Sequence, residues 1–426
     1  MGIKILATAD LHLGKQSSDI TGKHASTRFT LERIVNCCIH ESVDVLLLCG
    51  DIVDWDNRYF EAYGPLQDAF DSLREHKVEV YLVAGNHDFD VLPQIIKTGN
   101  NQHVHLLGNN EKWEVREFTK HGQTIQFVGW SFANRFVNKS AMLSWDASIL
   151  NPNYQTIGLL HGDVGAKSQY GPINLDDLRT TNVALWLLGH IHKPQQLLEH
   201  PIVRYTGSPQ ALSANEPGIH GPLLITVIPN QPPEIQQIGM SPVRYENIFI
   251  DVTGVVNEEE IRNKVVHSLK EDAESRITEL EEVLSLVYNI TLVGKNSRPR
   301  EIDSWSTTFV EHTDRLETGT SISVRRVETQ ITPEVANLNQ LAQQSSPAGI
   351  LANTILAIDE GRDDPFLNDL IKEWIVKIEH ANRAGVYSYP LEERKLQITP
   401  EVARIAIKSE CNRLLGELLN QISNPN

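Results

Sequence analysis

The chain has 426 residues, of which 40% are hydrophobic and 22% are charged, values that are ordinary for a globular protein of two or three domains. No apolar run approaches the roughly 20 residues that span a bilayer, and the four cysteines have neither zinc-site nor disulfide spacing, so we expect a reduced, cytoplasmic protein without a membrane segment. The net charge of −17 argues against nucleic-acid binding over the whole surface, so any DNA contact must be local or supplied by a partner.

Predicted strands and helices alternate over residues 1–245. Residues 27–41 have helical spacing with apolar side chains on one face, and residues 60–75 are also predicted as a helix. The later strands follow one another with turns between them, which is typical of a sandwich of two sheets flanked by helices. The predicted strands are residues 3–9, 43–49, 78–84, 124–130, 156–160, 184–188, 203–206 and 223–228.

Prolines at positions 229, 232, 233 and 242 mark a domain boundary near residue 245. We predict a first domain of residues 1–245, a small α/β capping domain of residues 246–330 and a helical C-terminal region of residues 331–426. The helical region has apolar stripes in residues 348–357 and 403–422. The sequence Gln-Ile-Thr-Pro-Glu-Val-Ala occurs at residues 330–336 and again at 397–403. It predicts two similar helix starts, or it is a coincidence of a favourable capping sequence.

Five short polar motifs follow predicted strands of the first domain. Loops at strand ends are held in place by the rigid strands and are open to substrate. Each motif alone is a weak signal, but five in order at strand ends indicate one site. Thirteen of the 16 histidines also lie in residues 1–245, and imidazole is the commonest metal ligand. The motifs are Asp10-Leu11-His12, Gly50-Asp51-Ile52-Val53-Asp54, Gly85-Asn86-His87-Asp88, His161-Gly162-Asp163 and Gly189-His190-Ile191-His192.

The residue types in these motifs indicate a site for two divalent cations. Two cations about 4 Å apart can clamp the attacking and leaving oxygens of a phosphoryl transfer, and a shared carboxylate holds them together. A mixture of Asp, His and Asn suits Mn²⁺, Fe²⁺ or Zn²⁺ better than an all-oxygen Mg²⁺ site. Since residues i and i+2 of a strand share a face, we expect Asp10 with His12, and His190 with His192, to point the same way.

The five motifs resemble those of the calcineurin-like metallophosphoesterase superfamily. The stretch Thr8-Ala9-Asp10-Leu11-His12-Leu13-Gly14 resembles the start of its SbcD-type DNA double-strand-break repair nucleases. The resemblance covers residues 1 to about 245 and implies the superfamily's two-sheet α/β sandwich. It also implies that His87 donates a proton or a hydrogen bond to the leaving oxygen and that Asp54 orients His87. The implied ligands are Asp10, His12, Asp51 and His192 for one metal, and Asp51, Asn86, His161 and His190 for the second.

This chain departs from the superfamily's patterns near Asp54. Residues Asp54-Trp55-Asp56 stand where the superfamily's phosphoprotein phosphatases have Asp-Arg-Gly, so the arginine that clamps phosphate is missing. Archaeal nucleases often have a histidine at the position of Asp54, which leaves exonuclease against endonuclease activity open. Lys15 and Arg28 contact a DNA backbone or are solvated loop charges. Gly207-Ser208 resembles a turn of the nuclease branch that contacts the site or is a turn only.

The resemblance implies a Mn²⁺-dependent nuclease that hydrolyses DNA phosphodiesters in end processing, repair or phage defence. It implies an SMC-like ABC ATPase of the SbcC type as a partner, docking on residues 348–422, and a homodimer. The same motifs are compatible with a small-molecule phosphodiesterase or phosphatase, which would prefer nucleotides or model esters to polymer. A third interpretation is a non-catalytic scaffold that recruits an ATPase to DNA, but the intact ligand set favours an enzyme.

Overall fold

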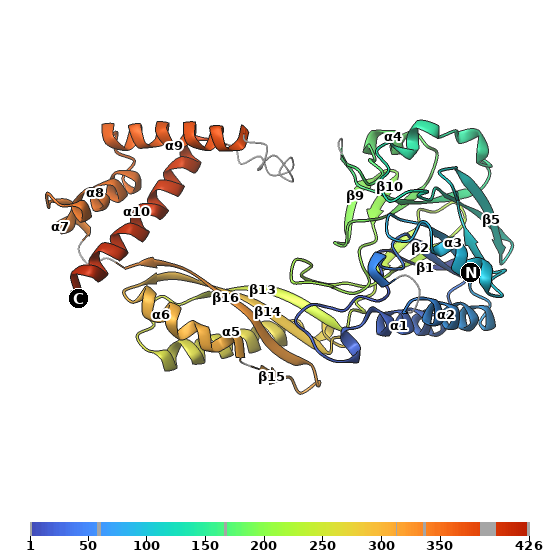
Figure 1. Ribbon diagram of the computed structural model, residues 1–426, viewed down its shortest axis with the longest axis horizontal. Helices are drawn as coiled ribbons and strands as arrows, with labels where there is room; N and C mark the ends of the chain where they lie inside the picture. Colours follow the sequence, from blue (N-terminus) through green and yellow to red (C-terminus); the bar gives the residue numbers. More distant parts are fainter. Residues whose placement is uncertain are drawn as a thin grey trace. The chain divides into compact units, whose positions relative to one another are not determined.

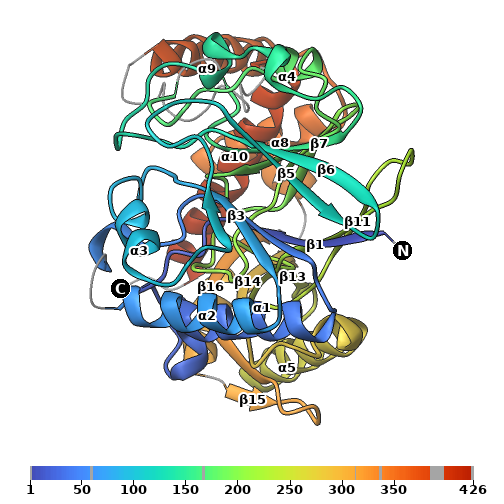
Figure 2. The same ribbon diagram turned by 90° about the vertical axis from the view of Figure 1, so that its right-hand side faces the viewer.

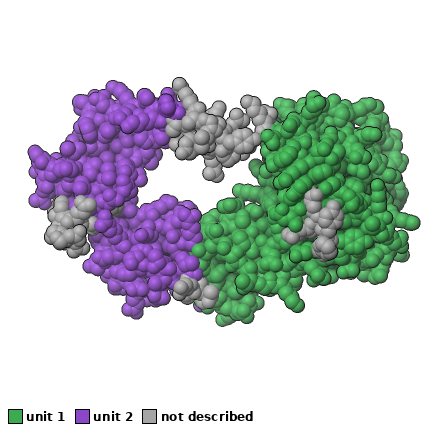
Figure 3. All heavy atoms as spheres, in the orientation of Figure 1, with its two compact units in different colours: residues 1–247, 273–289, 312–325 green, residues 248–272, 290–311, 326–426 purple. Residues whose placement is uncertain are grey.

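The computed structural model describes residues 2–57, 61–165, 168–311, 313–334, 338–383 and 398–423. The chain divides into two compact units, which are coloured separately in Figure 3. The predicted division into residues 1–245, 246–330 and 331–426 stays a prediction. Unit 1 consists of Met1–Asn247, Ala273–Asn289 and His312–Arg325, and unit 2 of Ile248–Asp272, Ile290–Glu311 and Arg326–Asn426.

The first sheet of unit 1 has the strand order β12-β11-β1-β2-β3-β4. Strands β1 to β4 are parallel, whereas β11 is antiparallel to both β1 and β12. The central strands read as continuous apolar runs because both faces of the sheet are covered. The strands are Ile3–Thr8 (β1), Val45–Cys49 (β2), Glu79–Val83 (β3), Val104–Leu106 (β4), Leu223–Val227 (β11) and Glu234–Gln237 (β12).

The second sheet of unit 1 has the order β5-β6-β7-β8-β10-β9. Its inner strands β6, β7, β8 and β10 are parallel, and the two edge strands β5 and β9 are antiparallel to their neighbours. The strands are Glu114–Lys120 (β5), Gln123–Gly129 (β6), Gln155–His161 (β7), Leu185–Gly189 (β8), Gln195–Glu199 (β9) and Ile202–Tyr205 (β10).

Apolar side chains from both sheets fill the space between them. Tyr81 of β3, Phe127 of β6 and Leu187 of β8 belong to this core, and none of them is more than 3% exposed. Burial of this apolar surface is the main favourable contribution to folding. The outer face of the second sheet packs on a second cluster, in which Trp186 of β8 contacts side chains of the loops that follow β6 and β7.

Helices cover the outer face of the first sheet. Helices α1 (Thr27–His40) and α2 (Tyr63–Glu75) lie side by side there, as Figures 1 and 2 show, and α3 (Leu92–Thr98) packs on the same cluster. On the other sheet, the short helix α4 (Leu175–Arg179) contributes Leu178 to the outer cluster. The predicted fold class, a two-sheet α/β sandwich flanked by helices, is therefore confirmed.

Four strands of these sheets, β4, β5, β9 and β12, are absent from the sequence predictions. Strands β5 and β9 lie at sheet edges and are rich in polar residues, so no apolar run marks them. The helix predicted for residues 60–75 begins at Tyr63, and Phe60 lies outside the described residues. Short 3-10 helices span Lys23–Ala25, Trp55–Asn57, Ala141–Ser144, Ala147–Ile149, Ile277–Glu279 and Thr307–Glu311.

A third sheet has the strand order β13-β14-β16-β15. Helix α5 (Glu258–Ser275) begins after Asn257, whose Oδ1 accepts a hydrogen bond from Glu260 N at 2.9 Å. The elements of this part are Val243–Asp251 (β13), Ser285–Asn296 (β14), Thr313–Arg315 (β15), Ser321–Pro333 (β16) and Pro299–Ser306 (α6).

The last part of unit 2 is helical and has its own core, which includes Ala352, Ile355, Leu367 and Leu415. The helices are Leu338–Ala342 (α7), Pro347–Asp359 (α8), Pro365–Arg383 (α9) and Pro400–Ser423 (α10). Within the described residues, no helix is long and apolar enough to cross a membrane.

The predicted pair of similar helix starts is wrong for the first copy. Residues 330–333 end strand β16, whereas the second copy begins α10 at Pro400. Pairing within the sheet overrides the local capping preference of the first copy. Val335, Ala336 and Gln397 of the repeated sequence lie outside the described residues.

Candidate metal centre

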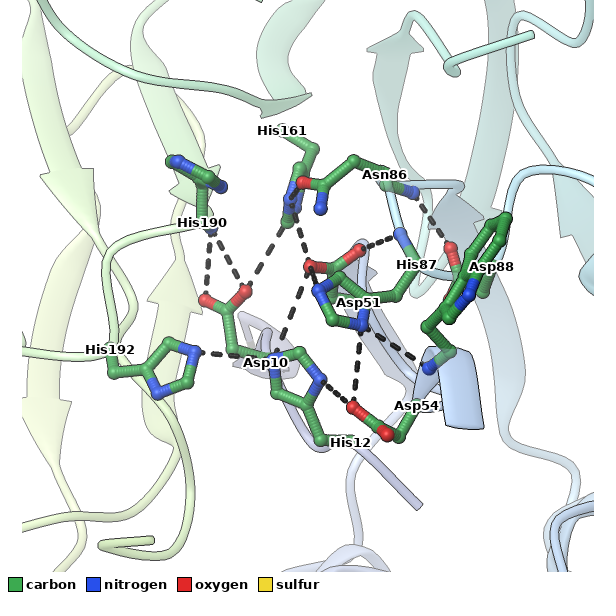
Figure 4. A network of polar contacts seen from close by, with 12 residues as sticks. Asp10, His12, Asp51, Asp54, Asn86, His87, Asp88, His161, His190 and His192 are labelled. Carbon is green, nitrogen blue, oxygen red and sulfur yellow. Dashed lines mark hydrogen bonds and ion pairs between the residues drawn. The ribbon is translucent and has the colours of Figure 1, made fainter. Parts of the chain in front are cut away.

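The motif side chains lie at the carboxyl ends of five strands, the parallel neighbours β1, β2 and β3 in one sheet and the parallel neighbours β7 and β8 in the other. Because parallel strands end at the same edge of a sheet, their loops meet there. Figure 4 shows the carboxylates of Asp10 and Asp51 in the middle, with imidazole rings around them. Asp10 and His12 follow β1, Asp51 and Asp54 follow β2, Asn86 and His87 follow β3, His161 ends β7, and His190 and His192 follow β8.

The backbone of several motif residues adopts torsions that L residues seldom take. Backbone hydrogen bonds hold these loops together, since Asp10 N donates to Gly50 O and His12 N donates to Asp51 O, both at 3.0 Å. The strand alternation expected for Asp10 and His12, and for His190 and His192, is therefore wrong, because all four follow their strands. Their side chains converge because the loops interlock. The φ angle is 52° at Asp10, 47° at His12, 50° at Asp51 and 98° at His190.

Glycines that precede two of the ligand motifs allow a close approach of neighbouring groups. A Cβ atom at Gly85 would lie 2.2 Å from Oδ1 of Asp51, and one at Gly50 would lie 2.5 Å from Nδ1 of His161. Gly50 also has a φ of 90°, which disfavours any side chain. These positions bring Asp51 and His161 together.

One group of possible metal ligands consists of Asp10, His12 and His192, whose ligand atoms lie within 4.8 Å of one another. Nδ1 of His12 lies 3.2 Å from Oδ1 of Asp54, and Nδ1 of His192 lies 3.1 Å from Oε1 of Glu216. Each Nδ1 therefore carries the proton that it donates, which leaves a lone pair on each Nε2. The two Nε2 atoms face each other at 3.1 Å, so a cation between them fits this arrangement.

A second group consists of Asp51, His161 and His190. Nδ1 of His161 donates to Cys49 O at 3.0 Å, so in the neutral ring the lone pair lies on Nε2. That Nε2 lies 3.1 Å from Oδ1 of Asn86 and 3.3 Å from Oδ2 of Asp51, and both oxygens are acceptors. Three acceptors that face one another need a proton or a cation, so these residues fit a second metal with Asp51 near it.

The pKa values of the buried groups also indicate that this site needs additional positive charge. Burial raises the pKa of Asp10 above its ordinary value. Burial opposes a charge on His161 as well, but the Asp51 carboxylate outweighs it and raises the pKa of His161 to about 9. Burial and the neighbouring His161 lower the pKa of His190 to about 3, so this ring is neutral and can bind a metal.

Asp54 is shared by three side chains. Its Oδ1 lies 3.2 Å from Nδ1 of His12, 3.3 Å from Nδ1 of His87 and 2.9 Å from Nζ of Lys15. Burial works against the charge of Asp54, but these hydrogen bonds outweigh it and hold its pKa below the usual range. His12, Asp54 and His87 also form a possible ligand group, but the Lys15 ammonium already supplies the positive charge there.

His87 has a partner at Nδ1 in either protonation state. A protonated Nδ1 donates to Asp54, and a deprotonated Nδ1 accepts from the backbone N–H of Trp55 at 3.2 Å. The backbone N–H of His87 donates to Oδ1 of Asp51 at 2.8 Å, which fixes the position of the ring next to the metal ligands. The arrangement suits a residue that exchanges a proton with substrate.

The site and fold agree with a comparison against known families. Residues 3–194 match the family described as calcineurin-like phosphoesterase. The match includes the strands from β1 to β8 and all five motifs. The residue types of the candidate metal ligands agree with this family, and the identity of the metal stays a prediction.

Two curated proteins and one solved structure are similar to parts of the chain. A metallophosphoesterase of Bacillus subtilis, YhaO, is 32% identical over 240 residues, which are 54% of this chain and 57% of that protein. The DNA double-strand break repair protein Mre11 of Methanopyrus kandleri is 23% identical over 295 residues, 62% of each chain. The matches therefore span about three fifths of these relatives, 57% and 62%. A dimetal phosphatase of Danio rerio, 15% identical, covers 56% of this chain and 96% of its own with a TM-score of 0.37.

Glu216 is a functional candidate that sequence reasoning missed. Its Oε1 accepts from Nδ1 of His192 at 3.1 Å, and its Oε2 accepts from Leu212 N at 2.9 Å. Burial opposes its charge, but the hydrogen bond from His192 outweighs it and lowers the pKa of Glu216. Glu216 lies in a loop without a motif, so no local signal in the sequence marks it.

The four residues predicted to contact substrate lie in different surroundings. Lys15 pairs with Asp54 inside the site, and Arg28 forms an ion pair with Glu32 on its own helix, with 3.6 Å between Arg28 Nε and Glu32 Oε1. Ser208 is fully buried behind His192, where its backbone N–H donates to His192 O at 2.8 Å. Gly207 has a φ of 73°, as a turn requires. Contact of any of these residues with substrate stays a prediction.

Asp88 has a structural role. It is fully buried, and its carboxylate accepts from Ile52 N at 2.7 Å and from Gly85 N at 2.8 Å. Burial, with the nearby charge of Asp51, raises the pKa of Asp88 to about 7. The carboxylate therefore joins the loops that follow β2 and β3.

Proposed function

We propose that this chain is a metal-dependent nuclease that hydrolyses phosphodiester bonds of DNA, with Mn²⁺ as the best metal. One observation carries the proposal: His161 Nε2, Asn86 Oδ1 and Asp51 Oδ2 face one another at 3.1 and 3.3 Å as acceptors. Divalent cations bound there would polarise phosphate oxygens as Lewis acids. The residues that would hold them are Asp10, His12, Asp51, Asn86, His161, His190 and His192.

His87 is the residue that we expect to hold and move a proton. Its side chain is 24% exposed, whereas those of Asp51 and Asp54 are at most 3% exposed, so substrate can reach His87. With Nδ1 held by Asp54, the protonated ring can donate from Nε2 to the leaving oxygen. Such general acid catalysis contributes about 10²- to 10⁴-fold to the rate.

DNA as the substrate is supported by two observations. The Methanopyrus kandleri relative is named as a DNA double-strand break repair protein. The chain also has Trp55 after Asp54, where the superfamily's phosphoprotein phosphatases have an arginine that clamps a terminal phosphate. A small-molecule phosphodiesterase or phosphatase on the same domain is the alternative.

The first experiment measures hydrolysis by the purified full chain in Mn²⁺ and in excess chelator. The substrates are linear single-stranded DNA, linear and circular duplex DNA, and bis(4-nitrophenyl) phosphate. We expect Mn²⁺-dependent cleavage of DNA. Cleavage of the small ester without any cleavage of DNA would establish the alternative. No hydrolysis of any substrate would leave the scaffold interpretation.

The second experiment tests His87 directly. We expect His87→Ala to lower kcat on DNA by about 10²- to 10⁴-fold. His40→Ala is the matched control, because the His40 side chain is 87% exposed at the end of α1. Equal rates for His87→Ala and the wild-type protein would refute the assigned role.

The partners belong to the same proposal. An SMC-like ABC ATPase of the SbcC type would dock on α8 and α10, where Ile350 and Ile405 are 55% and 64% exposed. Exposed apolar side chains on neighbouring helices support a protein partner. Light scattering would test the proposed homodimer, and co-purification with an ATPase encoded by a neighbouring gene would test the docking.

A further inference from the structure

An exposed arginine lies between aromatic rings at the edge of the metal centre. Cζ of Arg135 lies 4.4 Å from the centroid of the Trp55 ring and 5.5 Å from that of Phe136. Trp55 stacks on Phe89 with 6.3 Å between ring centroids and 26° between planes. We call Phe89, Trp55, Arg135, Phe136 and Tyr170 the arginine–aromatic row.

The arginine–aromatic row adjoins the candidate catalytic residues at both ends. Phe136 lies 5.7 Å from Tyr170, and Tyr170 lies 5.1 Å from the ring of His190, a candidate metal ligand. At the other end, the backbone N–H of Trp55 contacts His87. The members come from the loops after β2, β3, β6 and β7, all at the sheet edge that carries the metal centre. A ligand on this row therefore lies next to the hydrolysed bond.

The row combines positive charge with one exposed ring, that of Phe136, and three half-buried rings. Phe136 is 50% exposed, and Arg135 is exposed as well. In the part of the chain that the structure describes, no carboxylate lies within ion-pair distance of Arg135. A guanidinium that stacks through its face keeps its N–H edges for phosphate oxygens. Exposed aromatic faces accept the faces of nucleobases, and no base sequence is required.

We propose that the arginine–aromatic row is a nucleobase subsite, on which unpaired bases next to the scissile phosphodiester stack while Arg135 contacts a neighbouring phosphate. This inference rests on the proposed nuclease function. It adds that the arginine–aromatic row selects DNA with unpaired bases as the substrate. Bases within a duplex are paired and stacked on one another, so they cannot reach the row. The row therefore favours single strands and frayed ends over intact duplex.

The test measures whether the protein recognises the bases of DNA or only its sugar-phosphate backbone. The full chain in Mn²⁺ is given oligothymidine and an oligomer of tetrahydrofuran abasic residues of equal length, which has the same phosphates but no bases. Stacking of each base corresponds to roughly 5- to 150-fold in affinity. We expect the wild-type protein to prefer oligothymidine by at least about fivefold in kcat/KM.

Variants then assign the preference to the row. We expect Phe136→Ala to remove most of the preference, and Phe136→Trp, which keeps an aromatic face, to retain it. Phe249→Ala is the matched control, because Phe249 is 69% exposed in unit 2, and it should keep the wild-type ratio. Thermal unfolding of each variant checks that it is folded.

The outcomes distinguish the two proposals. Equal kcat/KM for both oligomers in the wild-type protein, or an unchanged ratio in Phe136→Ala, would overturn the subsite and leave the nuclease function standing. No cleavage of either oligomer would overturn the nuclease function itself, and with it the subsite.

Discussion

Replacing Glu216 by glutamine removes the negative charge behind the candidate ligand His192. Glu216 Oε1 accepts from His192 Nδ1 at 3.1 Å, and the Glu216 side chain is only 14% exposed, so little solvent screens the pair. A carboxylate in this position orients the imidazole and raises its basicity as a ligand, and its loss typically weakens metal affinity by about 10- to 100-fold. This corresponds to about 1.4–2.8 kcal/mol of binding free energy.

The same change has a smaller effect on folding. Glu216 Oε2 also accepts from Leu212 N at 2.9 Å, and the single amide oxygen of glutamine can replace only one of the two acceptors. A lost hydrogen bond lowers the free energy of unfolding by about 1 kcal/mol. Urea unfolding of the metal-free protein therefore separates this effect from the loss of metal affinity.

Titration calorimetry with Mn²⁺ measures the affinity. Glu216→Ala should weaken binding more than Glu216→Gln, because alanine also removes the acceptor for His192. Glu234→Gln is the control, since Glu234 is an exposed residue of β12. Wild-type affinity in both Glu216 variants would refute the reasoning that His192 binds metal with support from Glu216.

Three further predictions concern stability. Gly158→Ala should lower the free energy of unfolding by about 1–3 kcal/mol, because its Cβ would lie 2.2 Å from the buried Trp186 ring. Mn²⁺ at about 100 times its Kd should raise the melting temperature by about 5–10 °C over that in chelator, and Asp51→Asn should lack this shift. Burial lowers the pKa of His103, whose Nε2 donates to Phe70 O, below the ordinary 6.5. The unfolded chain therefore binds this proton first as pH falls through 6.5, so stability falls, and His103→Gln should reduce that fall.

Each of these predictions has its own control. Gly64→Ala serves for Gly158→Ala, since a Cβ at Gly64 would meet nothing within 4 Å. An unaltered melting temperature on addition of Mn²⁺ would contradict a metal centre of useful affinity. For the pH dependence, metal-free protein is unfolded in urea between pH 5 and 7, roughly the range in which histidine titrates, and the exposed His40→Gln should follow the wild-type curve.

The sequence predicts best the strands that are marked by apolar runs and the site residues that lie in short motifs. The central strands of both sheets are marked by their apolar runs, whereas the polar edge strands β5 and β9 are not. The motifs identify the residues that meet at the sheet edge, but the expected strand geometry of Asp10 and His12 is wrong, because the left-handed backbone is set by loops that interlock. Glu216 shows the limit of motif reasoning, since only the folded chain brings it to His192.

Asp54 links two parts of the site that are usually considered separately. One carboxylate oxygen serves His12, a candidate metal ligand, and His87, the candidate proton donor. A cation bound to Nε2 of His12 would keep the proton of that ring on Nδ1, where it donates to Asp54. Metal loading should thus hold the Asp54 carboxylate in the position from which it orients His87.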